Sequence, residues 1–238
     1  MTTELYKIRK GIRFSLGFVA LLWIIKAVEQ VVSFDFVVFG IYPRTLLGSV
    51  GIFTGPLIHG DVSHLISNSI PLLILMIGLF YFYRAIAFRI FILLYVMTGI
   101  WVWFAARDAY HIGASGLVYG IISFLLFSGF IRRDIKSLSL SFVIMILYGG
   151  NIFYGIIPGD SDVSWESHLL GVLAGIFCSV YFRKVGISAN IKDEQNAVEI
   201  SFDKTNYFTG KNLKRYHYSE KKKEDTYHYT LDRKNEHL

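Results

Sequence analysis

The chain has 238 residues, of which 53% are hydrophobic and only 18% are charged, and its formal net charge is +6. Soluble domains carry about 25% charged residues. The shortage here is uneven, because residues 186–238 hold 19 of the 42 charged side chains. A soluble globule does not segregate its charges in this way, so the composition predicts an all-α polytopic membrane protein with a polar tail. The single cysteine, Cys178, excludes a disulfide framework and a cysteine-ligated metal site.

Crossing a bilayer takes about 20 predominantly apolar residues, and six segments approach or reach this length. In chain order they are Phe14–Phe34, Leu65–Tyr83, Ile86–Phe104, Ile112–Ile131, Leu138–Ile157 and Trp165–Phe182. The first follows a basic segment, as the core of a signal peptide does, but it is too long and lacks a small-residue cleavage site, so we expect an uncleaved helix. It contains Lys26 and Glu29, whose i,i+3 spacing favours a structural pair on one helix face over an ion pathway.

Lysine and arginine alternate between rich and poor connections along the chain. The N-terminus and the connections after the second, fourth and sixth spans are rich, whereas 35–63, 105–111 and 158–164 are poor. By the positive-inside rule, both termini are expected in the cytoplasm and the three poor connections outside. We therefore expect a cytoplasmic N-terminus at 1–13, a six-helix membrane domain at 14–185 and a largely disordered cytoplasmic tail at 186–238. The compact six-span form suggests a bacterial inner membrane.

This orientation makes the second, fourth and sixth spans all begin at the outer surface, so their first turns lie at similar depth. Those turns contain His64 and Asn68, Ser115 and Tyr119, and His168 respectively. Each residue alone has an ordinary structural explanation, since serine is a packing residue and asparagine an interhelical hydrogen-bond residue in many membrane helices. Together they supply what acyl transfer needs: a nucleophile, a base and donors for developing negative charge.

Small residues indicate how two of these helices pack. The fourth and sixth spans each carry glycines four residues apart, Gly116 with Gly120 and Gly171 with Gly175. Such pairs let helix backbones approach closely, and this contact would bring Ser115 within hydrogen-bond reach of His168. No carboxylate other than Glu166 lies at a depth from which it can orient the histidine, so the sequence favours a Ser–His dyad over a triad.

The serine also lies at the start of a helix. Gly113 suits a tight turn before Ser115, and the first-turn N–H groups of a helix have no intrahelical acceptor. Those N–H groups can stabilise an oxyanion, as can the side chains of His64 and Asn68, which share one face of the neighbouring helix.

Other chemistries fit the sequence less well. It contains no His-Glu-x-x-His motif and no pair of intramembrane aspartates. A zinc site from His59, His64, His111 and His168 is conceivable, because imidazole suits zinc. The i,i+5 spacing of the first two would spread them around a helix, however, and no acidic or thiolate ligand joins them. We therefore expect neither a metal nor a cofactor.

At these residues the chain resembles the rhomboid family of intramembrane serine proteases in its six-helix bacterial form. The family's GxSG motif matches Gly113-Ala114-Ser115-Gly116, its HxxxN motif matches His64 to Asn68, and its sixth-helix pattern matches His168, Gly171 and Gly175. The resemblance covers roughly residues 12–185, with the motifs in the expected order and spans.

The resemblance implies a role for each of these side chains. Ser115 would be the nucleophile and His168 the general base. His64 and Asn68 would form the oxyanion hole together with the backbone N–H of the serine. Tyr119 matches the aromatic residue that packs against the histidine in relatives.

The resemblance also implies an activity: a serine endopeptidase that works in the lipid bilayer and cuts single-span membrane proteins in or near their transmembrane helix. No nucleic-acid partner is expected. Water must reach the serine, so we expect an outward-open cavity lined by His59, Asp61, Ser63, His64 and His111. By family analogy the fifth span and the loop after it gate substrate access.

The chain departs from the family pattern at two places. Tyr42-Pro43-Arg44 stands where many relatives have a Trp-Arg pair, and Ser167 precedes the base where glycine or alanine is common.

Two other functions are alternatives to a protease. A proteolytically silent relative that binds membrane helices is one alternative, although silent members lose the serine or the histidine. A small transporter or channel is the other, although the sequence shows no internal repeat.

Overall fold

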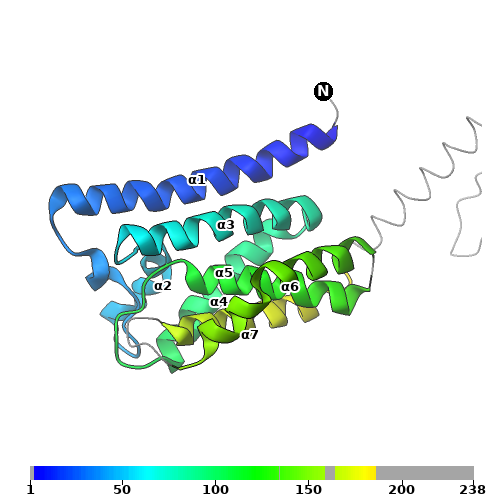
Figure 1. The fold of residues 1–238 in the computed structure, drawn as a ribbon. Coiled ribbons are helices and arrows are strands. Elements are labelled where there is room, and N and C mark those ends of the chain that lie inside the picture. The colour runs from blue at the N-terminus through cyan, green and yellow to red at the C-terminus, as the bar shows by residue number, and fades with distance from the viewer. Residues whose placement is uncertain (1–2, 134, 159–163, 186–238) are drawn as a thin grey trace, which may run out of the picture. The chain divides into compact units, whose positions relative to one another are not determined.

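The computed structural model describes residues 3–133, 135–158 and 164–185 (Figure 1). Six long helices lie within these residues, each at the position of one predicted span: α1 (Thr3–Val32), α3 (Val62–Phe82), α4 (Ala87–Ala105), α5 (Ser115–Arg132), α6 (Ile135–Ile156) and α7 (Trp165–Tyr181). By length and composition α1, α3, α4 and α5 can cross a membrane. Helix α6 is 22 residues long, and its described residues include an apolar stretch at 137–150. Helix α7, with 17 residues, is at the lower limit for crossing. The chain is a helical multi-pass membrane protein.

Helix α5 is the central element of the bundle, and it packs most extensively against α7. Glycines make this contact possible. A Cβ atom at Gly171 would lie 3.0 Å from the carbonyl carbon of Gly116 and nearer still to its oxygen, and one at Gly175 would lie 2.8 Å from the backbone nitrogen of Phe124. The close approach of these two helices, expected from the glycine spacing, is therefore present.

Helix α1 runs alongside α3 (Figure 1) and holds the segment just before α3 through an ion pair. Lys26 Nζ donates to Glu29 Oε2 at 2.6 Å and to the backbone oxygens of His59 and Gly60, each at 2.9 Å. The other carboxylate oxygen of Glu29 accepts the N–H of Phe36 at 2.9 Å. The pair predicted within the first span is thus confirmed, and its polar partners are backbone groups of the first loop.

The outer sides of the helices are apolar. Large hydrophobic side chains lie exposed on each of the six long helices, among them Ile24, Ile70, Phe88, Phe130, Ile146 and Phe177. A soluble protein does not expose apolar surface on this scale, whereas lipid covers it without cost.

The loop between α1 and α3 contains the short helices η1 (Phe36–Phe39), η2 (Leu47–Ser49), α2 (Gly51–Thr54) and η3 (Gly55–Leu57). It is anchored on α4. Tyr95 Oη donates to the backbone oxygen of Phe53 at 2.5 Å, and Arg44 donates to the backbone oxygen of Ala106 at 2.7 Å and pairs with Asp108. The arginine of the departing Tyr-Pro-Arg sequence therefore binds the end of α4.

Two expectations about the ends of the chain have different outcomes. The predicted tail, residues 186–238, lies outside the described residues. At the other end, α1 begins at Thr3, so most of the basic segment before the first span is helical. The domain boundaries at 13 and 185 stay predictions.

Candidate active site

A cavity of about 900 Å³ lies where the first turns of α3, α5 and α7 meet. It is lined by all the side chains for which a chemical role is predicted: Ser115, His168, His64, Asn68 and Tyr119. The three helices that carry them therefore begin at the same end of the bundle, as the orientation argument predicts. Gly155, in the last turn of α6, lines the same cavity.

Ser115 is half-buried and is the first residue of α5. The turn before it depends on glycine, because Gly113 has a left-handed backbone with φ of +99°. A Cβ atom there would lie 2.7 Å from Cε1 of His64. The imidazole of His64 therefore lies against the turn that presents the serine, and glycine is required both for the conformation and for the space.

The ring of His168 is held from two sides and is only 8% exposed. It stacks on Tyr119, with ring centroids 4.2 Å apart and planes 3° apart. Its Nδ1 lies 2.8 Å from the carbonyl oxygen of Gly155. Because a carbonyl only accepts, Nδ1 carries the proton of the neutral ring and Nε2 is unprotonated, as a base requires. The carboxylate considered for orienting this ring, Glu166, instead faces Arg107 at 3.5 Å.

His64 and Asn68 lie one turn apart at the start of α3. Asp61 caps this helix by accepting the N–H of His64 at 2.7 Å, and this bond holds the pKa of the Asp61 carboxyl below its usual range. Asn68 is 5% exposed and donates from Nδ2 to the carbonyl oxygen of His64 at 2.9 Å. The side chain of Asn68 is thus held by its own helix, and both side chains line the cavity.

His111 joins the segment before α5 to the start of α7, a role that no sequence pattern indicates. Its backbone pairs with that of Ile41 through two hydrogen bonds, of 2.8 and 3.0 Å. Its Nε2 donates to the carbonyl oxygen of Arg107 at 3.0 Å, so Nδ1 accepts from the hydroxyl of Ser164 at 2.6 Å. Ser164 is the N-cap of α7. Burial lowers the pKa of His111, which favours the neutral ring that this arrangement needs.

The predicted cavity lining is partly wrong. Asp61, His64 and His111 line the cavity, whereas Ser63 and His59 do not, and His59 is only 1% exposed. The spacing argument against a zinc site that includes both His59 and His64 also fails. It treats the two residues as part of one helix, whereas α3 begins after His59. The rings of His59 and His64 are 5.1 Å apart, edge to face. Within the described ranges, no three histidine, cysteine or acidic side chains are placed to bind a metal ion.

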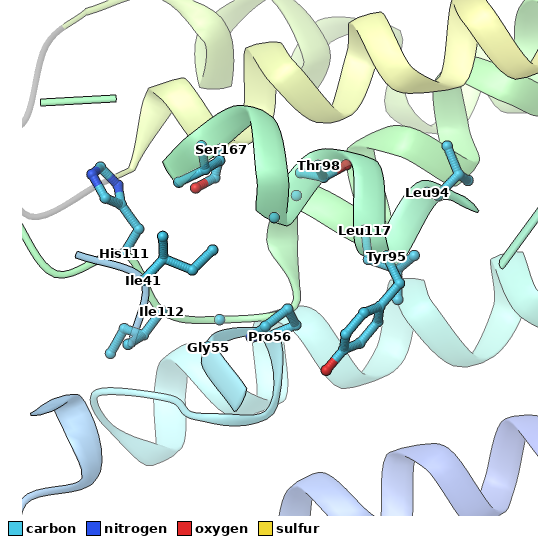
Figure 2. A pocket seen from close by; sticks show the side chains of 14 residues that line it. Ile41, Gly55, Pro56, Leu94, Tyr95, Thr98, His111, Ile112, Leu117 and Ser167 are labelled. Atoms are coloured by element: carbon cyan, nitrogen blue, oxygen red, sulfur yellow. The ribbon is translucent and has the colours of Figure 1, made fainter. Parts of the chain in front are cut away.

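A second, smaller cavity of about 20 Å³ lies behind the serine turn, between the first loop, α4, α5 and the start of α7 (Figure 2). Its lining is mostly apolar and includes Ile41, Pro56 and Leu117. Thr98 also lines it, and among the described residues the buried hydroxyl of Thr98 has no hydrogen-bond partner. The space behind the serine turn is therefore no larger than about one or two water molecules need.

A family model and several known proteins match more than half of the chain. A family model described as the Rhomboid domain matches residues 48–185, which include α3 to α7 and every predicted site residue. Uncharacterized proteins of Mycobacterium bovis and Mycobacterium tuberculosis are each 34% identical over 175 residues, 68% of this chain and 70% of the relative. One of Mycobacterium leprae is 32% identical over 175 residues, 68% of this chain and 67% of the relative. By these matches the chain belongs to the rhomboid family, the family of intramembrane serine proteases.

Proposed function

We propose that this chain is an intramembrane serine endopeptidase in which Ser115 is the nucleophile and His168 is the general base. One observation carries the proposal: the two side chains line the same cavity, with His168 in the tautomer that leaves Nε2 unprotonated. The family match agrees with it. In this proposal the carbonyl of Gly155 takes the orienting role that an aspartate has in a catalytic triad.

The reaction runs in two steps. Nε2 of His168 takes the hydroxyl proton of Ser115 while Oγ attacks the scissile carbonyl carbon, and the imidazolium then gives that proton to the leaving amine nitrogen. An ester joins the serine to the new carboxyl end of the substrate. A water molecule, deprotonated by the same Nε2, attacks this ester, and the imidazolium returns the proton to Oγ of Ser115 as the C–O bond breaks and the new carboxyl end is released.

Negative charge develops on the carbonyl oxygen in both steps. The N–H groups of the first turn of α5 have no acceptor within the helix, and the N–H of Ser115 is the first of them. We assign the oxyanion hole to this N–H and to the side chains of His64 and Asn68, which line the cavity from α3. Removing one such donor costs about 10²–10³-fold in turnover in serine proteases.

The proposed substrates are single-span membrane proteins cut in or near their transmembrane helix. A helix hides its carbonyls in backbone hydrogen bonds, so the cut segment must unwind, and helix-weakening residues near a small residue favour this. The cavity of about 900 Å³ gives room for an extended segment of a few residues. We propose no cofactor and no nucleic-acid partner.

We further propose a bacterial inner membrane, with both termini in the cytoplasm and the cavity near the outer face. The chain suits a cysteine-accessibility test, because its single cysteine, Cys178, is fully buried. Cysteine in place of the exposed Asp108 should react with an impermeant maleimide added to intact cells. Reaction only after the cells are opened would reverse the proposed orientation.

Cleavage in proteoliposomes tests the activity. The purified chain is reconstituted with a panel of single-span proteins that carry glycine, alanine or serine next to proline in the outer half of the helix. The wild type should cut at least one of them, and Ser115→Ala and His168→Ala should cut none. Ser63→Ala is the matched control, because this serine is exposed and outside the cavity lining. Cleavage that persists in Ser115→Ala would refute the assignment of the nucleophile.

A further inference from the structure

A buried histidine outside the cavity contacts the backbone next to the serine. His59 lies between η3 and α3, and its Nε2 accepts a hydrogen bond from the N–H of Ala114 at 3.3 Å. Because the donor is an N–H group, Nε2 must be unprotonated and the ring neutral. Burial lowers the pKa of His59 to about 4, so this neutral form is the one present at pH 7.

The hydrogen bond from Ala114 is one of two that orient the serine turn. The N–H of Gly113 donates to the carbonyl oxygen of Gly55 at 3.0 Å, and the next N–H, that of Ala114, donates to His59. Two successive peptide planes are thereby fixed by the segment before α3. The following N–H belongs to Ser115, so the orientation of this turn sets where its N–H and its Cβ point.

The segment that carries His59 is itself held on several sides. Lys26, paired with Glu29, donates to the carbonyl oxygens of His59 and Gly60, and the ring of His64 packs edge to face on that of His59. These are the charged and titratable groups that face the ring. The two α1 residues lie outside residues 48–185, the segment that the family model matches.

We propose that His59 is a positioning residue that holds the turn carrying Ser115 by accepting the Ala114 N–H. This rests on the proposed function, in which Ser115 is the nucleophile. His59 does not line the cavity, so it is assigned no contact with substrate and acts by holding the backbone of the turn. Losing its acceptor would let the turn rotate and move both the hydroxyl and the oxyanion-binding N–H of the serine.

Two amide variants separate the acceptor from the packing. In His59→Gln the side-chain oxygen is as many bonds from the backbone as Nε2 and can accept the same N–H. In His59→Asn it is one bond shorter and cannot reach. The first readout is the rate at which a fluorophosphonate labels Ser115, with Ser115→Ala as the unlabelled control. We expect labelling within about threefold of wild type for His59→Gln and at least about tenfold slower for His59→Asn, because small misplacements of reacting groups are costly.

The second readout needs no catalysis: hydrogen exchange at the Ala114 amide should be faster in His59→Asn and near the wild-type rate in His59→Gln. Wild-type labelling in His59→Asn, equally slow labelling in both folded variants, or unchanged exchange would each overturn the proposal. If His59→Asn does not fold, His59→Met, which fills the space without an acceptor, replaces it under the same criteria. If hydrogen exchange in the two variants follows the expectation but the wild type takes up no probe, the failure lies in the proposed nucleophile and not in the contact of His59 with Ala114.

Discussion

Replacing Gly171 by alanine should separate the helix that carries the serine from the helix that carries the histidine. The new Cβ would lie 3.0 Å from the carbonyl carbon of Gly116, and nearer still to its oxygen, whereas ordinary contacts begin at 3.4 Å. Both partners are helix backbone, which cannot rotate away as a side chain can. We therefore expect α5 and α7 to move apart by roughly 0.5–1 Å.

Two measurable costs follow from this separation. Overpacking a well-packed contact costs about 1–3 kcal/mol of stability. His168 lies one turn before Gly171 on α7, so it would move with the helix relative to Ser115. A displacement near 1 Å between reacting groups can cost about 10²-fold in rate. The variant should thus lose far more activity than stability.

The assay is the rate of fluorophosphonate labelling beside the midpoint of thermal unfolding in detergent. Gly78→Ala is the matched control, because a Cβ atom at this α3 glycine would meet nothing within 4 Å. It should label at the wild-type rate and unfold at an equal or higher temperature, since alanine favours a helix over glycine by about 1 kcal/mol. A folded Gly171→Ala that labels as fast as wild type would refute the claim that this helix contact sets the Ser–His geometry.

Three further substitutions test other parts of the account. Lys26→Met leaves the buried carboxylate of Glu29 without its ammonium partner and should cost about 3–5 kcal/mol of unfolding free energy, most of it recovered by adding Glu29→Gln; a cost below about 1 kcal/mol would contradict this. Tyr119→Phe keeps the ring stacked on His168 and should label within about threefold of wild type, whereas Tyr119→Leu should be slower by up to about tenfold; equal rates would remove the stacking argument. Thr98→Val replaces a buried hydroxyl that has no partner among the described residues, so its unfolding midpoint should equal or exceed that of wild type. A loss of more than about 1 kcal/mol in the free energy of unfolding would show that the hydroxyl makes a hydrogen bond.

The helices could be predicted because their signal is local. Apolar length located all six long helices, and a local cap or turn accounts for where two of them, α3 and α5, begin. Asp61 caps α3 earlier than the apolar stretch begins, and Gly113, with its left-handed backbone, delays α5 until Ser115. The glycine pairs predicted the contact between α5 and α7 because only backbone fits there.

The rest of the site depends on contacts between distant segments. Nothing near His59 in the sequence indicates that it binds the N–H of Ala114, and nothing near Gly155 indicates that its carbonyl orients His168. His111 likewise acts through a hydroxyl on the start of α7. A sequence pattern identifies chemical groups and their helix faces, whereas such pairings arise only once the helices are packed.

The most direct test of the central claim is fluorophosphonate labelling of the wild type in membranes, with the labelled peptide identified by mass spectrometry. An activated serine should carry the probe at Ser115, and labelling should disappear in both Ser115→Ala and His168→Ala. A folded wild type that takes up no probe, or carries it on another serine, would contradict the proposed nucleophile and leave a helix-binding, proteolytically silent rhomboid protein as the better account.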